Sequence, residues 1–111
     1  MAPKRSATAA LAGAAPVFAA LGDETRLRIV AQLSTQGPQS IARLTESTDV
    51  SRQAITKHLY VLEGARLARS IRAGRESIWE LRPERLEEVR RYLDEISGQW
   101  DAALERLRAF V

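Results

Sequence analysis

The sequence predicts a mainly helical α+β domain in which five helices accompany one two-stranded β-hairpin. Three observations predict this fold class. Apolar residues recur at steps of three and four along most of the chain, which is the period of helices buried on one face. Two short segments, 67–72 and 77–82, flank a turn that contains Gly74, as in a hairpin. The 111 residues allow one modest core and therefore one domain.

The first fifteen residues are rich in alanine and show no periodic apolar face. We therefore expect residues 1–15 to form a flexible tail and residues 16–111 to form the folded domain. Proline is well tolerated in the first turn of a helix, so Pro16 predicts the start of a short helix that continues to Leu21.

Two further helices are expected before the middle of the chain. Asp23 is a good N-cap for a helix over 24–34, and Gly37-Pro38 stops that helix. A third helix covers about 40–47, and residues 48–50 then form a turn, because aspartate tolerates turn conformations. The residues expected on the buried side of the helix over 24–34 are Leu27, Val30, Ala31 and Leu33.

A fourth helix over 51–64 starts at Ser51, which is a favourable N-cap. Ile55, Leu59 and Leu62 follow at steps of four and three, so they predict one buried face. A short helix, a turn, a second helix and then a hairpin is the order of parts in a winged helix-turn-helix.

The opposite face of this fourth helix is polar and basic, which predicts contact with DNA in the major groove. Arginine suits guanine, glutamine suits adenine, and threonine suits a thymine methyl group or a phosphate. Lys57 and the two hairpin arginines are expected to contact the sugar–phosphate backbone. The predicted DNA-binding residues are Ser51, Arg52, Gln53, Thr56, Lys57, His58, Tyr60, Arg72 and Arg75.

The charge distribution agrees with that prediction. Net charge is +3, but residues 50–82 carry seven Lys/Arg against three Asp/Glu, whereas residues 83–111 carry five against seven. A basic middle indicates a polyanionic partner, here double-stranded DNA, and an acidic end indicates a different role.

Little else in the chain predicts chemistry. The single histidine, His58, lies beside an apolar face, so a structural hydrogen bond is favoured over a DNA contact and a metal ligand is disfavoured. The chain has no cysteine, no phosphate-binding glycine loop and no paired-carboxylate motif. We therefore expect no catalytic residue, no cofactor and no metal site, and the protein is not predicted to be an enzyme.

Composition also bears on location. Hydrophobic residues make up 45% and charged residues 28% of the chain, which is ordinary for a globular protein. No segment approaches the roughly 20 apolar residues that span a membrane. The alanine-rich run after Lys4 and Arg5 is a weak match to a signal peptide. We expect a cytoplasmic protein with no membrane partner.

The last helix is predicted over 83–110, opened by Pro83. Its apolar residues alternate in steps of three and four, which forms a heptad seam longer than a small domain needs for its own core. Packing within the chain is one interpretation, and a dimer interface is the favoured one. The predicted dimer residues are Phe18, Leu86, Val89, Leu93, Ile96, Trp100, Leu104 and Leu107.

Two segments carry a resemblance to a known family. Residues 21–30 and 51–62 read LGDETRLRIV and SRQAITKHLYVL, and they resemble the best-marked segments of the ArsR/SmtB family of bacterial repressors. The likeness extends over about residues 17–108. It implies a homodimer built on the first and last helices that represses by occupying an inverted repeat in a promoter. It also implies that Gln53, Thr56 and His58 lie at or near the DNA.

The chain departs from that family at several positions. Metal-sensing members carry Cys-x-Cys in the third helix, where Ser40 and Ala42 stand here, and others use histidines on the last helix, which has none. The resemblance is therefore to members without these metal sites. Thr48-Asp49 replaces a usual Leu-Gly, and Arg66 stands where glycine commonly follows the recognition helix.

Alternatives remain open at this point. A sequence-specific dimeric repressor is favoured over an activator, over a winged-helix module that only binds proteins, and over a non-specific architectural DNA-binding protein. A small-molecule effector of unknown identity is a further hypothetical partner. Trp100 and its neighbours would line such a pocket, although simple packing of the seam is the favoured interpretation there.

Overall fold

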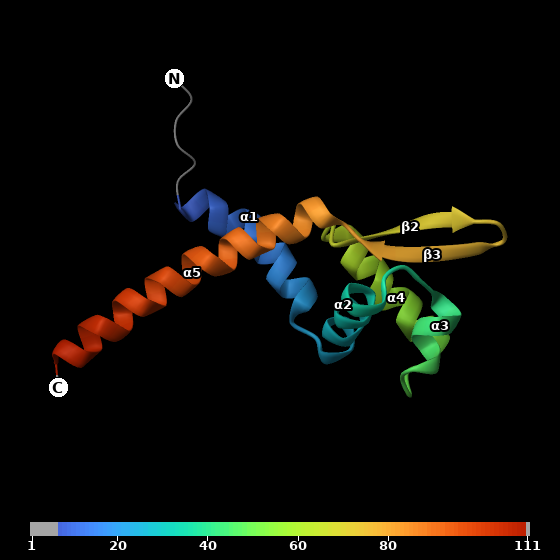
Figure 1. Ribbon diagram of the computed structural model, residues 1–111, viewed down its shortest axis with the longest axis horizontal. Coiled ribbons are helices and arrows are strands. Elements are labelled where there is room, and N and C mark those ends of the chain that lie inside the picture. Colours follow the sequence, from blue (N-terminus) through green and yellow to red (C-terminus); the bar gives the residue numbers. More distant parts are fainter. Residues whose placement is uncertain (1–6, 111) are drawn as a thin grey trace, which may run out of the picture.

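Over residues 7–110, which the computed structural model describes, the chain forms five helices and one three-stranded antiparallel sheet (Figure 1). This confirms the predicted mainly helical α+β fold class. No helix in that range is long and apolar enough to cross a membrane. The elements in chain order are α1 (Ala7–Leu21), α2 (Glu24–Gln36), β1 (Gln39–Ser40), α3 (Ile41–Glu46), α4 (Arg52–Gly64), β2 (Ala68–Ala73), β3 (Glu76–Leu81) and α5 (Pro83–Ala109).

Three side-chain caps set where the central helices begin. Each cap residue has an extended backbone, and its side-chain oxygen accepts a hydrogen bond from the backbone N–H three residues later. The predicted caps at Asp23 and Ser51 are thereby confirmed. The three bonds run from Arg26 N to Asp23 Oδ2 (3.0 Å), from Arg43 N to Ser40 Oγ (3.1 Å) and from Ala54 N to Ser51 Oγ (3.2 Å).

One hydrophobic core lies between α2, α3, α4, the sheet and the first part of α5. The predicted inner face of α4 is confirmed, because its three apolar residues have no exposed surface. On α2 the prediction was partly wrong: Leu33 is buried and Val30 half-buried, whereas Leu27 and Ala31 are exposed. Ile29, which was not predicted, is buried in their place. Other buried members of the core are Val17, Leu44, Ile55, Leu59, Leu62, Leu67, Trp79 and Val89.

The sheet has one strand more than predicted. β1 pairs with the outer edge of β3, with Gln39 opposite Trp79 and Ser40 opposite Ile78, so the strand order is β1-β3-β2. A strand of two residues is too short to show an alternating apolar pattern in the sequence. It forms because β3, far along the chain, pairs with it. The predicted hairpin is confirmed, since β2 and β3 pair from Ala68–Leu81 to Ala73–Glu76. We call this hairpin the wing.

Helix α1 begins at Ala7 and not at Pro16, which lies inside the helix. The prediction of a tail over 1–15 is therefore wrong for the part that the structure describes, and residues 1–6 lie outside it. Alanine has the highest helix propensity and its methyl group allows close packing, so a helix forms without large periodic residues. Ala14, Val17 and Ala20 provide the buried side of α1.

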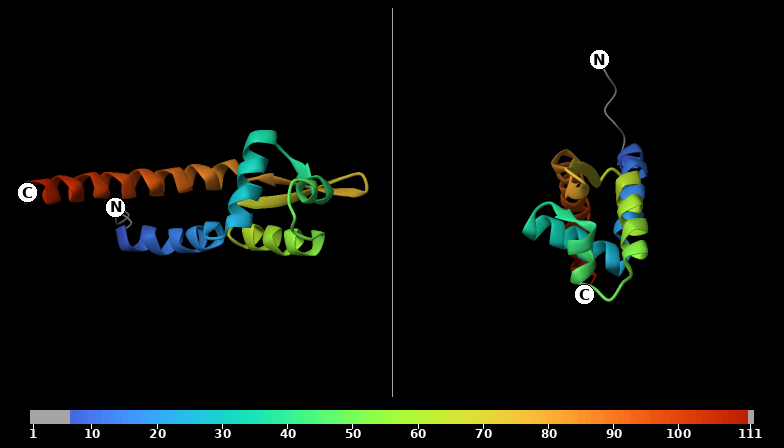
Figure 2. Two further views of the ribbon diagram at one scale, coloured as in Figure 1. Left: turned by 90° about the horizontal axis from the view of Figure 1, so that it is seen from below. Right: turned by 90° about the vertical axis from the view of Figure 1, so that its right-hand side faces the viewer.

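Helix α5 leaves the body of the domain. Its first part packs across α1, and its C-terminal part projects away from every other element (Figure 1). The half-buried Arg85 anchors the start of α5, because its guanidinium donates to the backbone oxygen of Ala65 (3.2 Å) and to the carboxylate of Glu88 (2.5 Å). The wing tip and the end of α5 consequently lie at opposite ends of the molecule (Figure 2).

Candidate nucleic-acid interface

One face of helix α4 packs against the core, and the opposite face is exposed. Its buried residues point into the core, whereas Gln53, Lys57 and Tyr60 are exposed on the far side. Ser51 and Arg52 are also exposed, at the N-terminal end of the helix. The exposed polar face of α4 can therefore contact another molecule while the buried face stays packed against the core.

Thr56 lies at the margin of this exposed face and is half-buried. Its hydroxyl donates to the backbone oxygen of Arg52 at 2.9 Å, one helical turn earlier. The proton of the hydroxyl is thus used inside α4. What remains for a partner molecule is the methyl group and the acceptor capacity of the oxygen.

His58 points toward α2 and not along the exposed face. Its Nδ1 lies 3.2 Å from a terminal nitrogen of Arg26 and 3.9 Å from Asp23 Oδ2. A guanidinium only donates hydrogen bonds, so a bond between these two atoms requires Nδ1 to be the unprotonated ring nitrogen. Of the three roles weighed for His58, this contact supports the structural hydrogen bond, and its assignment to the DNA contacts stays a prediction.

Arg26 is the residue in this region that the sequence analysis overlooked. Its side chain also donates to the backbone oxygen of Ala20 at 2.5 Å, so it joins the end of α1 to α4 through His58. The pKa of Asp23 is lowered, mainly because the backbone N–H of Arg26 donates to the carboxylate, with the nearby charge of Arg26 adding to the effect. The spacing Asp-x-x-Arg at a helix start is the signal for this link.

Tyr60 contacts the base of the wing. Its ring meets the ring of Trp79 edge-on, with centroids 6.1 Å apart and an interplanar angle of 69°. The tyrosine side chain is nevertheless 60% exposed, so its hydroxyl remains available at the surface. The contact fixes the position of the wing relative to α4.

The wing carries unpaired positive charge toward its tip. Gly74 takes a positive φ of 64° in the turn, which glycine adopts without strain, and Arg72 and Arg75 are exposed on either side of it. At the base of the wing, by contrast, Arg69 pairs with Glu80 at 2.8 Å. None of the ion pairs formed among residues 12–110 uses Arg52, Lys57, Arg72 or Arg75.

These unpaired charges share one end of the molecule. The N-terminal end of α4 and the wing tip point the same way, and the C-terminus of α5 points the other way (Figure 2). We call this the basic end, defined by Arg52, Gln53, Lys57, Arg72 and Arg75. Of the predicted DNA-binding residues, these five define the basic end. Ser51 and Thr56 lie beside them on or next to the first turns of α4, and Tyr60 lies toward the base of the wing.

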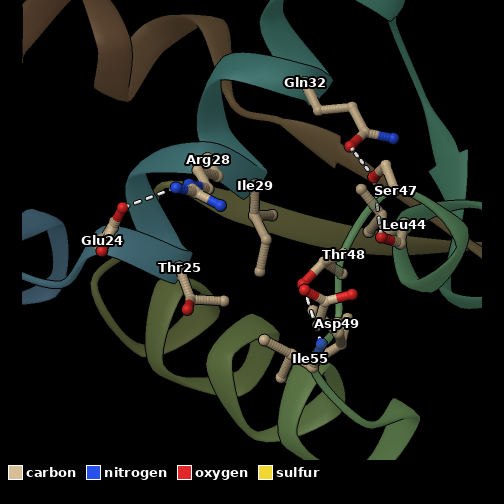
Figure 3. Close-up of a pocket in the computed structure, with 11 residues that line it drawn as sticks. Glu24, Thr25, Arg28, Ile29, Gln32, Leu44, Ser47, Thr48, Asp49 and Ile55 are labelled. Atoms are coloured by element: carbon tan, nitrogen blue, oxygen red, sulfur yellow. Dashed lines mark hydrogen bonds and ion pairs between the residues drawn. The ribbon is translucent and has the colours of Figure 1, made fainter.

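A hollow of about 350 Å³ lies on another side of α4, between α2 and the turn over 47–50 (Figure 3). Ile29, Leu44 and Ile55 form its apolar part. Hydrogen bonds hold its polar wall, since Ser47 Oγ donates to Gln32 Oε1 at 2.6 Å and the backbone N–H after Asp49 donates to the hydroxyl of Thr48 at 3.0 Å. These bonds fix the predicted turn against α2 and so set the angle at which α4 leaves it.

The predicted dimer seam divides into two parts. Val89 is only 7% exposed and Leu86 packs beside it, because α1 covers this part of α5. Val89 belongs to the core of the single chain and the half-buried Leu86 packs against that core, while the assignment of both to the dimer interface stays a prediction. Phe18 and Ile96 are half-buried. Large apolar side chains further along remain exposed: Leu93 (50%), Trp100 (69%), Leu104 (49%), Leu107 (62%) and Phe110 (91%).

We call these five residues the apolar end. Monomeric proteins rarely expose a continuous apolar face along a whole helix, so this surface is typical of one that a partner covers. The hollows found in the single chain do not include Trp100. An effector pocket at the seam therefore stays a prediction.

Comparisons with known proteins agree with this geometry. A family of helix-turn-helix domains, HTH_20, matches residues 21–71. The HTH-type transcriptional regulator Rv2034 of Mycobacterium tuberculosis is 39% identical over 85 residues, covering 77% of this chain and 76% of the relative.

Solved structures show the same architecture. An ArsR-like transcriptional regulator from Rhodococcus sp. RHA1 has 38% identity and a TM-score of 0.72, with 91% of this chain and 94% of that chain covered. The homodimeric winged helix-turn-helix DNA-binding domain of Mb0332 from Mycobacterium bovis has the same fold at 24% identity, with a TM-score of 0.65 over 89% of this chain and 91% of its own. The chain therefore belongs to the ArsR family of winged helix-turn-helix transcriptional regulators.

Proposed function

We propose that this regulator is a homodimeric repressor that binds an inverted-repeat operator with α4 in the major groove and the wing on the neighbouring backbone. The observation that carries the proposal is the separation of two unsatisfied surfaces. Unpaired cationic side chains gather at the basic end, and uncovered apolar side chains gather at the apolar end. DNA satisfies the first surface and a second copy of the chain satisfies the second.

The basic end supports a division between base and backbone contacts. Gln53 is exposed in the first turn of α4, the part that enters the groove most deeply in this motif, and a glutamine amide matches the edge of adenine. Lys57 and the wing arginines carry charge without a fixed partner, which suits phosphates. Phosphate contacts supply affinity, and base contacts supply sequence preference.

The apolar end supports the homodimer. The relative Mb0332 is homodimeric, and the exposed face of α5 here has the length and the heptad spacing that pairing of two helices requires. A two-fold axis through paired α5 helices would present two copies of α4. The operator would then contain two half-sites about 34 Å apart, or a multiple of that spacing.

Fluorescence anisotropy of the full chain with its own upstream DNA and with a scrambled duplex tests this proposal. We expect tight binding to the upstream DNA, a steep fall of affinity with salt and a clear preference over the scrambled duplex. A preference near one would indicate an architectural protein, and no binding at low salt would indicate a protein-interaction module. Either result would refute the proposal.

A reporter assay tests the repressor role separately. Deleting the gene is expected to raise expression from the promoter that contains the bound site, since a bound dimer excludes the polymerase. A fall in expression would identify an activator, and the DNA-binding result would still stand.

A further inference from the structure

A second hollow, of about 220 Å³, lies at the basic end between α4 and the wing. Arg52 lines it from the first turn of α4, and Arg75 lines it from the wing tip. Ser77 of β3 and the first residues of α3 form the remaining wall, with Glu76 beside them. We call this the helix–wing hollow. It is the place where the two elements expected on the DNA come together.

The charges around this hollow are unbalanced. Neither arginine takes part in any ion pair among residues 12–110, and Glu76, the single carboxylate in the lining, takes part in none either. The lining thus carries two guanidinium groups against one carboxylate. Two like charges that face one space repel each other unless an anion lies between them.

The donors in the lining match one kind of anion. A guanidinium presents a planar set of N–H donors that fits two oxygens of a phosphate. The hydroxyl of Ser77 takes part in none of the hydrogen bonds found among the described residues, so it is a further donor, whereas the Ser40 hydroxyl already accepts from Arg43 N. Hydrogen-bond donors on two sides of the hollow can therefore reach the oxygens of one tetrahedral phosphate group.

We infer that the helix–wing hollow binds one phosphodiester of the DNA backbone, held jointly by Arg52 of α4 and Arg75 of the wing. This inference rests on the proposed function and adds the ligand of a specific site to it. Arg52 then contacts the DNA backbone, whereas its position in the sequence had indicated a contact with guanine. Base selection falls to Gln53 and to residues further along the exposed face of α4.

Joint binding has a mechanical consequence. A phosphate between the two arginines bridges α4 to the wing, so both elements meet the same strand in a fixed register. The hollow is open and both arginines are exposed, so a free anion there competes with water and gains little. A phosphate of a duplex that α4 already holds loses little further translational freedom when it enters the hollow, so its binding is more favourable than that of a free anion.

Methylphosphonate scanning of the operator tests the inference with the full-length dimer. A neutral methylphosphonate replaces one phosphate at a time, and binding is compared for wild type, Arg52→Ala, Arg75→Ala and the double variant. We expect one phosphate in each half-site whose replacement weakens wild-type binding about tenfold. Replacement at that same position should have little further effect in either single variant and none in the double variant.

The salt dependence of DNA affinity gives an independent count of the phosphate contacts. Loss of one shared phosphate contact changes the slope of log K against log salt by about 0.9 per half-site, whereas loss of two separate phosphate contacts would change it by about 1.8 per half-site. Arg91→Ala is the matched control, because Arg91 is an exposed arginine on α5 outside the ion pairs of the described residues. It should leave binding and slope unchanged, and circular dichroism checks that each variant is folded.

Several outcomes would overturn the inference. These outcomes are mapping of the two arginines to different phosphates, a change of preferred base in Arg52→Ala, and saturation of the hollow by inorganic phosphate in the absence of DNA. Each result assigns the site differently. Failure of the proposed function itself would look different, because wild type would then show no preferred duplex and no sensitive phosphate at all.

Discussion

The two ends of this molecule expose opposite kinds of surface, one charged and one apolar. The basic end exposes arginines and a lysine that pair with no carboxylate among the described residues, while the apolar end exposes leucines, a tryptophan and a phenylalanine on a helix that leaves the domain. Ion pairs between them include Arg69 with Glu80 and Arg85 with Glu88. The two ends therefore suit different partners, a polyanion at one and an apolar surface at the other.

The apolar end gives the largest expected effect. Trp100→Asp places a carboxylate in the middle of the exposed face of α5, and burying that charge against a second copy without a partner costs several kcal/mol. We expect the dissociation constant of the dimer to rise by about 100-fold or more, and specific DNA affinity to fall with it. Analytical ultracentrifugation and anisotropy measure the two quantities.

Ala102→Asp is the control for this variant. Ala102 is exposed, and its position in the heptad is on the side of α5 away from the apolar residues. It adds the same charge to the same helix and should leave dimerisation intact. If Trp100→Asp dimerises as wild type does, the apolar end has another role and the comparison between the two ends fails.

The basic end should separate sequence preference from affinity. Gln53→Ala is expected to relax preference at one base pair by about tenfold or more, since a paired hydrogen bond to a base edge carries about 1–3 kcal/mol of discrimination. Lys57→Ala should weaken all duplexes alike and lower the salt slope by about 0.9 per half-site. Equal losses on operator and scrambled DNA for both variants would remove this division of labour.

Much of the basic end was predictable because its information is local. Ser51 marks the start of α4, and the spacing of Ile55, Leu59 and Leu62 fixes which side faces the core, so the exposed side follows by geometry. Hairpin and turn positions follow from Gly74 in the same way. The DNA contacts themselves remain predictions, because no nucleic acid is part of the structure.

The remaining features depend on residues far apart in the chain. The alanine helix α1 is held by α5, the two-residue β1 exists through β3, and His58 lies inward because Arg26 is there to meet it. The heptad pattern of α5 is continuous, so it did not show that α1 covers Val89 and leaves the later residues open. Periodicity predicts which face is apolar, but not what covers it.

Arg66 tests whether the basic end extends to the far end of α4. This residue follows the helix with a φ of 63°, a left-handed conformation that costs a side chain with a Cβ atom roughly 1 kcal/mol. Arg66→Gly is therefore expected to stabilise the fold by about 0.5–1 kcal/mol in urea unfolding. Arg66→Ala is the control and should give no such gain, since it keeps the Cβ atom.

DNA binding by the same variants sharpens the boundary. If Arg66→Gly and Arg66→Ala bind operator as wild type does, the strain belongs to the scaffold and the basic end stops before the C-terminus of α4. If both variants lose affinity equally, the lost charge is a backbone contact. Loss of affinity in the glycine variant alone would mean that the backbone conformation, and not the charge, matters there.

The smallest expected effect concerns the region between the two ends. The pKa of Asp23 lies below its usual 3.8, chiefly through the backbone hydrogen bond from Arg26, and the pKa of Glu84 lies below 4.5, chiefly through its own backbone N–H and then through Arg82. A carboxyl whose pKa is lower in the folded state stabilises the fold above its unfolded pKa. That contribution is lost as the pH falls through the lower, folded value.

Asp23→Asn isolates one of these two contributions. Asparagine is also a good N-cap and can accept the same hydrogen bond from Arg26, so stability near neutral pH should change little. Between about pH 5 and pH 2, however, the variant should lose less stability than wild type, because its cap does not bind a proton. Urea unfolding at a series of pH values measures this, with Glu84→Gln as the comparison. Identical profiles for wild type and Asp23→Asn would show that the cap and the link through Arg26 and His58 do not depend on the charge of Asp23.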